Sequence, residues 1–133
     1  MSESGMRGNF VKFLKGLGLD AVAVENPIFP GTPDVNYLHG WVELKWIRSW
    51  PKNPETPVRL KRYTNSQKLW IRRRTLAGGK AFLLVQCKRE WFLFKHPETM
   101  EIDGTPRQNF YDKAYRIWRN GLNTEEVMEA LCN

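Results

Sequence analysis

The chain has 133 residues with a mass of 15.6 kDa, the size of one domain, and 41% of its residues are hydrophobic, enough to build a core. This composition excludes a disordered linker. Lys and Arg number 21 against 14 Asp and Glu, so the formal net charge is +7, which is typical of small domains that bind nucleic acid. We therefore predict a single domain, residues 1–133, that acts on a polyanion.

The apolar segments and the cysteines narrow the class of protein. No apolar run approaches the ~18 residues of a membrane span, and no signal-peptide pattern occurs, so we expect no membrane partner. Cys87 and Cys132 lack the spacing of a zinc site or a disulfide scaffold. Two isolated cysteines are typical of proteins of the reducing cytoplasm, so we expect the protein to be cytoplasmic.

Hydrophobic periodicity predicts the elements of the N-terminal half. A stripe from Met6 to Leu17 predicts a first helix, with Ser2 as its cap and Gly16 and Gly18 near its end. The other elements expected in this half, in chain order, are a short buried strand over 21–24, an irregular proline-rich loop over 27–33, a β-hairpin of 35–38 with 41–46, and a long surface loop over 48–62.

In the C-terminal half we expect a second helix from Thr64 to about Ala77, then strands over 80–86 and 90–95. An apolar stripe from Phe110 to Leu122 predicts a third helix, and Asn123 with Glu126 predicts the capped start of a last one. The order is helix, three strands, helix, two strands, helices. This order predicts an α/β fold with a mixed sheet flanked by helices.

Three charged residues of the hairpin could form one site. Glu43 and Lys45 are two apart in a strand and share a face, while Leu44 points into the core. Asp34 precedes the partner strand, and a turn at His39-Gly40 brings it within reach of Glu43. Two converging carboxylates repel each other unless a cation lies between them, and such hard oxygen ligands suit Mg²⁺ or Mn²⁺. A neighbouring lysine would hold water and offset charge on a phosphate.

These residues resemble a known signature. Pro33-Asp34 followed by Glu43-Leu44-Lys45 resembles that of the PD-(D/E)XK nucleases, and the wider pattern is similar to the VRR-NUC branch, including its small bacteriophage-type members. The resemblance spans about residues 2–95, and a helical extension over about 107–132 lies outside it. Its elements are Ser2-Glu3, Gly31-Thr32-Pro33-Asp34, Glu43-Leu44-Lys45, Ser66-Gln67, Gly78-Gly79 and the apolar strand 81–85.

The resemblance implies a restriction-endonuclease-like αβββαβ core and a role for each matching residue. Asp34, Glu43 and the backbone carbonyl of Leu44 would bind Mg²⁺, with Mn²⁺ as a substitute. Lys45 would be the catalytic lysine, and Glu3 and Gln67 would complete the site. It also implies a bacterial host cytoplasm if the protein is phage-encoded.

Each of these residues also has a structural interpretation. Asp34 follows a proline as turn aspartates often do, and Glu43 and Lys45 could lie on a solvated strand face. Glu3 could interact favourably with the positive N-terminal end of the first helix, and Gln67 could complete a capping box with Thr64.

Basic residues gather before and along the second helix, which favours a surface that tracks phosphates over an ordinary solvated helix face. Trp46, Trp50 and Tyr63 could stack on unpaired bases, whereas Trp70, Trp91 and Trp118 fit the core. The predicted nucleic-acid-binding residues are Arg59, Lys61, Arg62, Lys68, Arg72, Arg73 and Arg74.

The sequence therefore predicts a Mg²⁺-dependent DNA endonuclease that is structure-selective or low in sequence specificity. One alternative is a resolvase of Holliday junctions or other branched DNA that acts as a homodimer, because paired incisions need two symmetric sites. An alternative of another class is a non-catalytic nucleic-acid-binding module. RNA also stays open as the nucleic acid.

Overall fold

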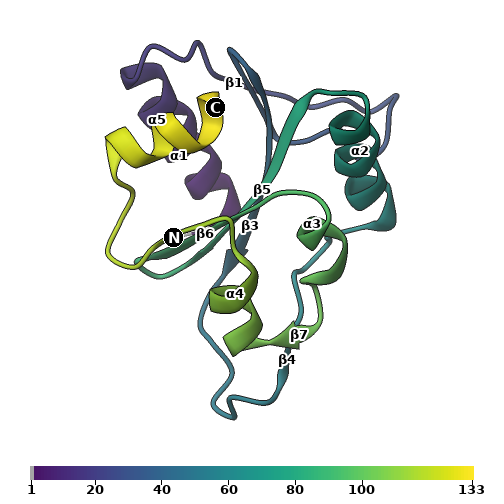
Figure 1. Cartoon of the computed structure of the whole chain (residues 1–133), viewed down its shortest axis with the longest axis vertical. Coiled ribbons are helices and arrows are strands. Elements are labelled where there is room, and N and C mark those ends of the chain that lie inside the picture. The colour runs from purple at the N-terminus through teal and green to yellow at the C-terminus, as the bar shows by residue number, and fades with distance from the viewer. Residues whose placement is uncertain (1) are drawn as a thin grey trace.

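A mixed sheet flanked by helices forms the centre of the protein, shown in Figure 1 as a computed structural model that describes residues 2–133. Within this range the main sheet has six strands in the order β1-β2-β3-β5-β6-β8. Their bounds are β1 Val22–Ala23, β2 Val35–Tyr37, β3 Gly40–Ile47, β5 Lys80–Cys87, β6 Glu90–Phe94 and β8 Arg116–Trp118. Strand β4, Pro57–Val58, pairs with β7, Thr105–Pro106, in a small second sheet.

The two central strands, β3 and β5, run parallel, and the other neighbours in the main sheet are antiparallel. Parallel pairing requires a crossover between the strands, and helix α2, Asn65–Leu76, provides it. Both central strands are covered on both faces. For this reason residues 81–87 form a continuous buried run instead of an alternating one.

Helices cover the two faces of the sheet in two groups (Figure 1). Helix α1, Glu3–Gly16, and helix α5, Thr124–Cys132, pack on one face around core residues such as Leu44 and Leu84. Helix α2 packs on the other face with α4, Arg107–Lys113, and the short α3, Glu98–Glu101, lies against α2.

Several predicted features of the sequence are confirmed. The Ser2 hydroxyl accepts the Gly5 N–H at the start of α1, and the Asn123 side chain accepts the Glu126 N–H at the start of α5. The hairpin of β2 and β3 pairs Val35 with Val42. The α/β class, with a mixed sheet flanked by helices, is likewise confirmed.

Two predictions about the N-terminal half were wrong in part. The strand near residue 22 is an edge strand with an exposed Val22, because it pairs with β2 alone. The segment 48–62 is not only a surface loop, since β4 within it pairs with β7 and Val58 and Leu60 are buried.

The third helix predicted from Phe110 to Leu122 was also wrong. Helix α4 ends at Lys113, Ala114 is extended, and the Tyr115 N–H donates to the Leu93 carbonyl at 2.7 Å. Residues 116–118 then form β8, the outer strand beside β6. The C-terminal extension over 107–132 is therefore only partly helical and contributes a strand to the main sheet.

None of the helices within residues 2–133 combines the length and apolar character that crossing a bilayer requires.

Candidate active site

The backbone of β3 holds the Asp34 carboxylate in place. Val35 pairs with Val42, so continuing the antiparallel register places Asp34 opposite Glu43. Strand β2 begins after Asp34, and the Asp34 side chain takes the place of a strand partner: its Oδ2 accepts the Leu44 N–H at 2.9 Å. The loop before β2 is thus fixed to the strand that carries the other candidate residues.

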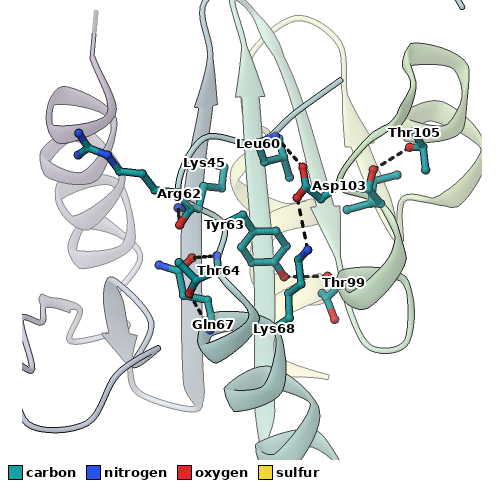
Figure 2. A network of polar contacts seen from close by, with 11 residues as sticks. Lys45, Leu60, Arg62, Tyr63, Thr64, Gln67, Lys68, Thr99, Asp103 and Thr105 are labelled. Atoms are coloured by element: carbon teal, nitrogen blue, oxygen red, sulfur yellow. Dashed lines mark hydrogen bonds and ion pairs between the residues drawn. The ribbon is translucent and has the colours of Figure 1, made fainter. Parts of the chain in front are cut away.

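Glu43 and Lys45 are buried on β3, with only 1% and 3% of their surface exposed. The interpretation that they lie on a solvated strand face is therefore wrong. The Lys45 Nζ lies 3.5 Å from the Glu43 Oε2 and donates to the Arg62 carbonyl at 3.0 Å. The end of Lys45 is shown beside Arg62 in Figure 2.

The Glu43 carboxyl group is only partly satisfied. Its Oε1 is buried and has no hydrogen-bond partner among residues 2–133. Burial, and secondly the negative charge of Asp34, raise the pKa of Glu43 to about 9, and the Lys45 ammonium opposes this shift. When no metal ion is bound, the folded protein therefore favours the protonated form of Glu43 more than the unfolded chain does.

Glu3 joins the site from the first turn of α1. Its Oε1 lies 3.8 Å from the Lys45 Nζ. Burial raises the pKa of Glu3, which the Lys45 charge opposes and the Asp34 charge reinforces. Glu3, Asp34, Leu44 and Arg62 line one pocket of about 210 Å³.

Within residues 2–133, the Gln67 side chain hydrogen-bonds to Thr64 and not to these site residues. Its Oε1 accepts the Thr64 N–H at 2.9 Å, and its own N–H donates to the Thr64 hydroxyl at 3.2 Å (Figure 2). These two bonds are the capping box at the start of α2, so the capping interpretation of Gln67 is confirmed. A role in the site stays a prediction.

The loop that ends at Asp34 rests against the start of α2. Gly31 has a φ of +87°, and a Cβ at this position would overlap the Ser66 carbonyl and lie 2.8 Å from the Gln67 nitrogen. Glycine is needed both for this close approach and for its left-handed conformation. The contact fixes the loop, and with it Asp34, relative to α2.

Nothing in the sequence pattern predicted that the backbone of the segment from Leu60 to Tyr63 supports the site. The Arg62 carbonyl in this segment accepts a hydrogen bond from the Lys45 ammonium. Asp103 holds this segment (Figure 2), because its Oδ1 accepts the Leu60 N–H at 2.8 Å and its Oδ2 lies 3.3 Å from the Lys68 Nζ. The Tyr63 hydroxyl donates to the Thr99 carbonyl at 2.8 Å. Arg62 itself has a φ of +58°, an uncommon conformation that its neighbours must impose.

The candidate metal ligands are oxygen atoms of the hairpin. No group of three or more His, Cys, Asp or Glu side chains within residues 2–133 is arranged to hold a metal ion. A cation here would therefore need Asp34 and Glu43 together with a backbone oxygen. The N–H and C=O of one strand residue point to the same side, so the Leu44 carbonyl faces the side on which Asp34 binds its N–H. The unpaired Glu43 oxygen and these hard donors fit Mg²⁺.

Most of the predicted nucleic-acid-binding side chains are exposed, while two are engaged within the protein. Lys68 pairs with Asp103, and Arg74 stacks over the Trp70 ring at 4.5 Å. The exposed ones are Arg59, Lys61, Arg62, Arg72 and Arg73.

The burial of the aromatic side chains differs in part from the prediction. Tyr63 is buried, and Trp50 packs against Phe92 and Phe110 in the core, so neither offers an open face to a base. Trp70 and Trp118 are buried as predicted.

Comparison with known proteins adds no relative to this picture. The chain matches no model of a known protein family, and a search of curated proteins finds no match either.

Proposed function

We propose that the protein is a metal-dependent DNA endonuclease of the PD-(D/E)XK type, built on a restriction-endonuclease-like core. The observation that carries the proposal is the buried Glu43–Lys45 pair with Asp34 beside it. Two ionisable side chains are expensive to bury and contribute little to stability for that cost. Asp34 beside them and Glu3 line a pocket, and this arrangement supports a chemical role.

Asp34, Glu43 and the Leu44 carbonyl would hold Mg²⁺ in this proposal, with Mn²⁺ as a substitute. The ion would polarise a phosphate oxygen and lower the pKa of a water molecule. A cation also explains the Glu43 Oε1, which is buried without a donor. A pure binding module has no need for two carboxyl groups facing each other beside the phosphates of DNA, which argues against that alternative.

Lys45 has the contacts expected of a group that orients water at a phosphate. Its ammonium carries three donors, and one of them is hydrogen-bonded to the Arg62 carbonyl. The Glu43 and Glu3 carboxyl groups lie 3.5 and 3.8 Å from the same nitrogen and help to hold it in place. It would direct a water molecule at the phosphodiester and offset the negative charge that develops there. The exposed arginines would hold the DNA backbone without reading bases, which favours low sequence specificity.

The proposal is tested by cleavage of labelled DNA in Mg²⁺, Mn²⁺ or EDTA. The substrates are a single strand, a duplex, a nicked duplex, a flap and a four-way junction. We expect cleavage that EDTA abolishes, and paired symmetric cuts in the junction would identify a resolvase. Binding without cleavage of any substrate in either metal would contradict the proposal and leave the non-catalytic binding module.

A further inference from the structure

A second cavity lies beside the candidate active site, between the loop 26–32 and helix α2. Its volume is about 460 Å³, and no carboxylate is among the described residues that line it. The lining includes two arginines and three aromatic side chains: Arg73, Arg74, Phe29, Trp41 and Trp70. We call this cavity the Trp41 groove.

The Trp41 groove adjoins the candidate site through two segments of chain. Trp41 and Glu43 are two residues apart on β3 and share a face, about 7 Å apart along the strand. Thr32, which also lines the groove, precedes Asp34 by two residues in the loop. Adjacent phosphates of a DNA strand are separated by a similar distance, so the groove lies within about one nucleotide of Glu43 along β3.

The groove combines flat apolar surfaces with positive charge. Trp41 and Trp70 pack edge to face with ring centroids 5.2 Å apart, and the Arg73 guanidinium lies 5.7 Å from the Trp70 ring. Phe29, which also lines the groove, leaves 65% of its surface in water. Aromatic rings beside exposed arginines are the surface that single-stranded nucleic acids recognise, because bases stack on rings and phosphates pair with guanidinium groups.

Hydrogen bonds within the loop restrain the segment that presents Phe29. The Asn26 side-chain oxygen accepts the N–H groups of both Ile28 and Phe29 at 3.1 Å, and the Thr32 hydroxyl donates to the Phe29 carbonyl. Gly31 anchors the end of the loop on α2. These contacts lower the conformational entropy that binding at Phe29 costs.

We infer that the Trp41 groove binds an unpaired nucleotide of the DNA strand adjacent to the cleaved phosphodiester. The base packs against Phe29 and Trp41, and Arg73 pairs with the phosphate. The inference rests on the proposed function for its substrate, DNA. Charge complementarity favours this ligand over a second copy of the chain, which carries the same net charge of +7 and would meet Arg73 with an equally basic surface.

The test measures DNA binding in EDTA, where cleavage plays no part. The probes are a fluorescent oligothymidylate of about 15 nucleotides and a duplex of the same length, followed by fluorescence anisotropy. Phe29→Ala should weaken binding of the single strand about tenfold and change binding of the duplex less than about twofold, because only an unpaired base can stack on Phe29. Arg73→Ala should weaken binding of the single strand and lower its salt dependence.

Matched controls come from residues outside the groove. Leu38→Ala removes another exposed apolar side chain, at the turn between β2 and β3. Lys15→Ala removes a positive charge from the last turn of α1, which is remote from Glu3 in the first turn. Both controls should bind the two probes as the wild type does.

Three results would overturn the inference. The first is that Phe29→Ala binds the single strand as the wild type does. The second is that it loses equal affinity for the single strand and the duplex. The third is that its mass in light scattering is lower than that of the wild type, which would make Phe29 a contact between copies of the chain. A protein that never cuts DNA but shows the expected loss contradicts the nuclease proposal alone. A protein that cuts DNA, and whose Phe29→Ala variant binds normally, contradicts only the groove.

Discussion

The backbone N–H of Leu44 donates to the Asp34 side chain at 2.9 Å. Leu44 lies on β3 between Glu43 and Lys45, which carry the other candidate groups. This bond fixes the position of Asp34 relative to β3 without any metal ion. It also directs the backbone of Leu44 toward Asp34, so a main-chain oxygen and a carboxylate face the same pocket. The candidate site is therefore largely organised before a ligand arrives.

Replacement of Lys45 should separate catalysis from binding. Lys45→Ala removes the ammonium that faces Glu43 and Glu3, so the single-turnover rate of cleavage should fall by about 100-fold or more. DNA affinity should stay within about threefold, because Lys45 is buried and contributes little to phosphate binding. The exposed Lys61 is the matched control, and Lys61→Ala should weaken binding more than cleavage of bound DNA. The reverse pattern would exclude Lys45 as the catalytic lysine.

Gly31 is predicted to be the glycine most sensitive to alanine. Gly31→Ala places a Cβ against the backbone of Ser66 and strains a residue with a φ of +87°, so the free energy of unfolding should fall by about 1–3 kcal/mol. In Gly8→Ala the new methyl meets no atom within 4 Å in α1, and this variant should be more stable by about 0.5–1 kcal/mol. Urea denaturation measures both. Equal stability of the two variants would mean that the loop does not pack on α2 as described.

Asp103 should act on the site from a distance. Asp103→Ala leaves the Leu60 N–H and Lys68 without their acceptor, which should lower the free energy of unfolding by about 1–3 kcal/mol. The segment that presents the Arg62 carbonyl to Lys45 loses its support, so cleavage should slow by about tenfold or more. Asp112→Ala, at an exposed position on α4, is the control and should change neither quantity. A stable but inactive Asp103→Asn variant would point to a direct role instead.

The raised pKa of Glu43 makes stability depend on pH when metal is absent. Its pKa rises from 4.5 to about 9 in the folded protein, so between these values the folded state keeps a proton that the unfolded chain has released. This difference makes the free energy of unfolding decrease as the pH rises through that window. Glu43→Gln removes the titration and should flatten the profile. Urea denaturation in EDTA at several pH values measures it, and a variant profile as steep as that of the wild type would contradict the assignment.

The hairpin and the charged residues on it could be predicted because the information is local. Residues 34–45 hold the turn, the strand alternation and the three charged side chains, so the position of Asp34 opposite Glu43 follows from continuing the register. The caps at Ser2, Thr64 and Asn123 are equally local. Such patterns act through neighbours only a few residues away.

The parts that were missed depend on distant neighbours. The apolar spacing from Phe110 to Leu122 suits a helix, yet Ile117 and Trp118 also suit a strand, and the open edge of β6 decides between them. The contact of Asp103 with Leu60 spans 43 residues, and that of Lys45 with the Arg62 carbonyl uses a backbone atom that no residue type reveals. Tertiary packing alone brings these groups together.

The most direct test of the account compares Asp34→Asn with the wild type in Mg²⁺, on the DNA substrate that the wild type cuts best. Asn keeps an oxygen that can accept the Leu44 N–H, so the fold and DNA binding should be preserved, whereas the carboxylate that would hold the metal is lost. The account predicts that single-turnover cleavage falls by about 100-fold or more, with affinity for DNA within about threefold. Cleavage at the wild-type rate would contradict it, because the nuclease centre would then lie elsewhere.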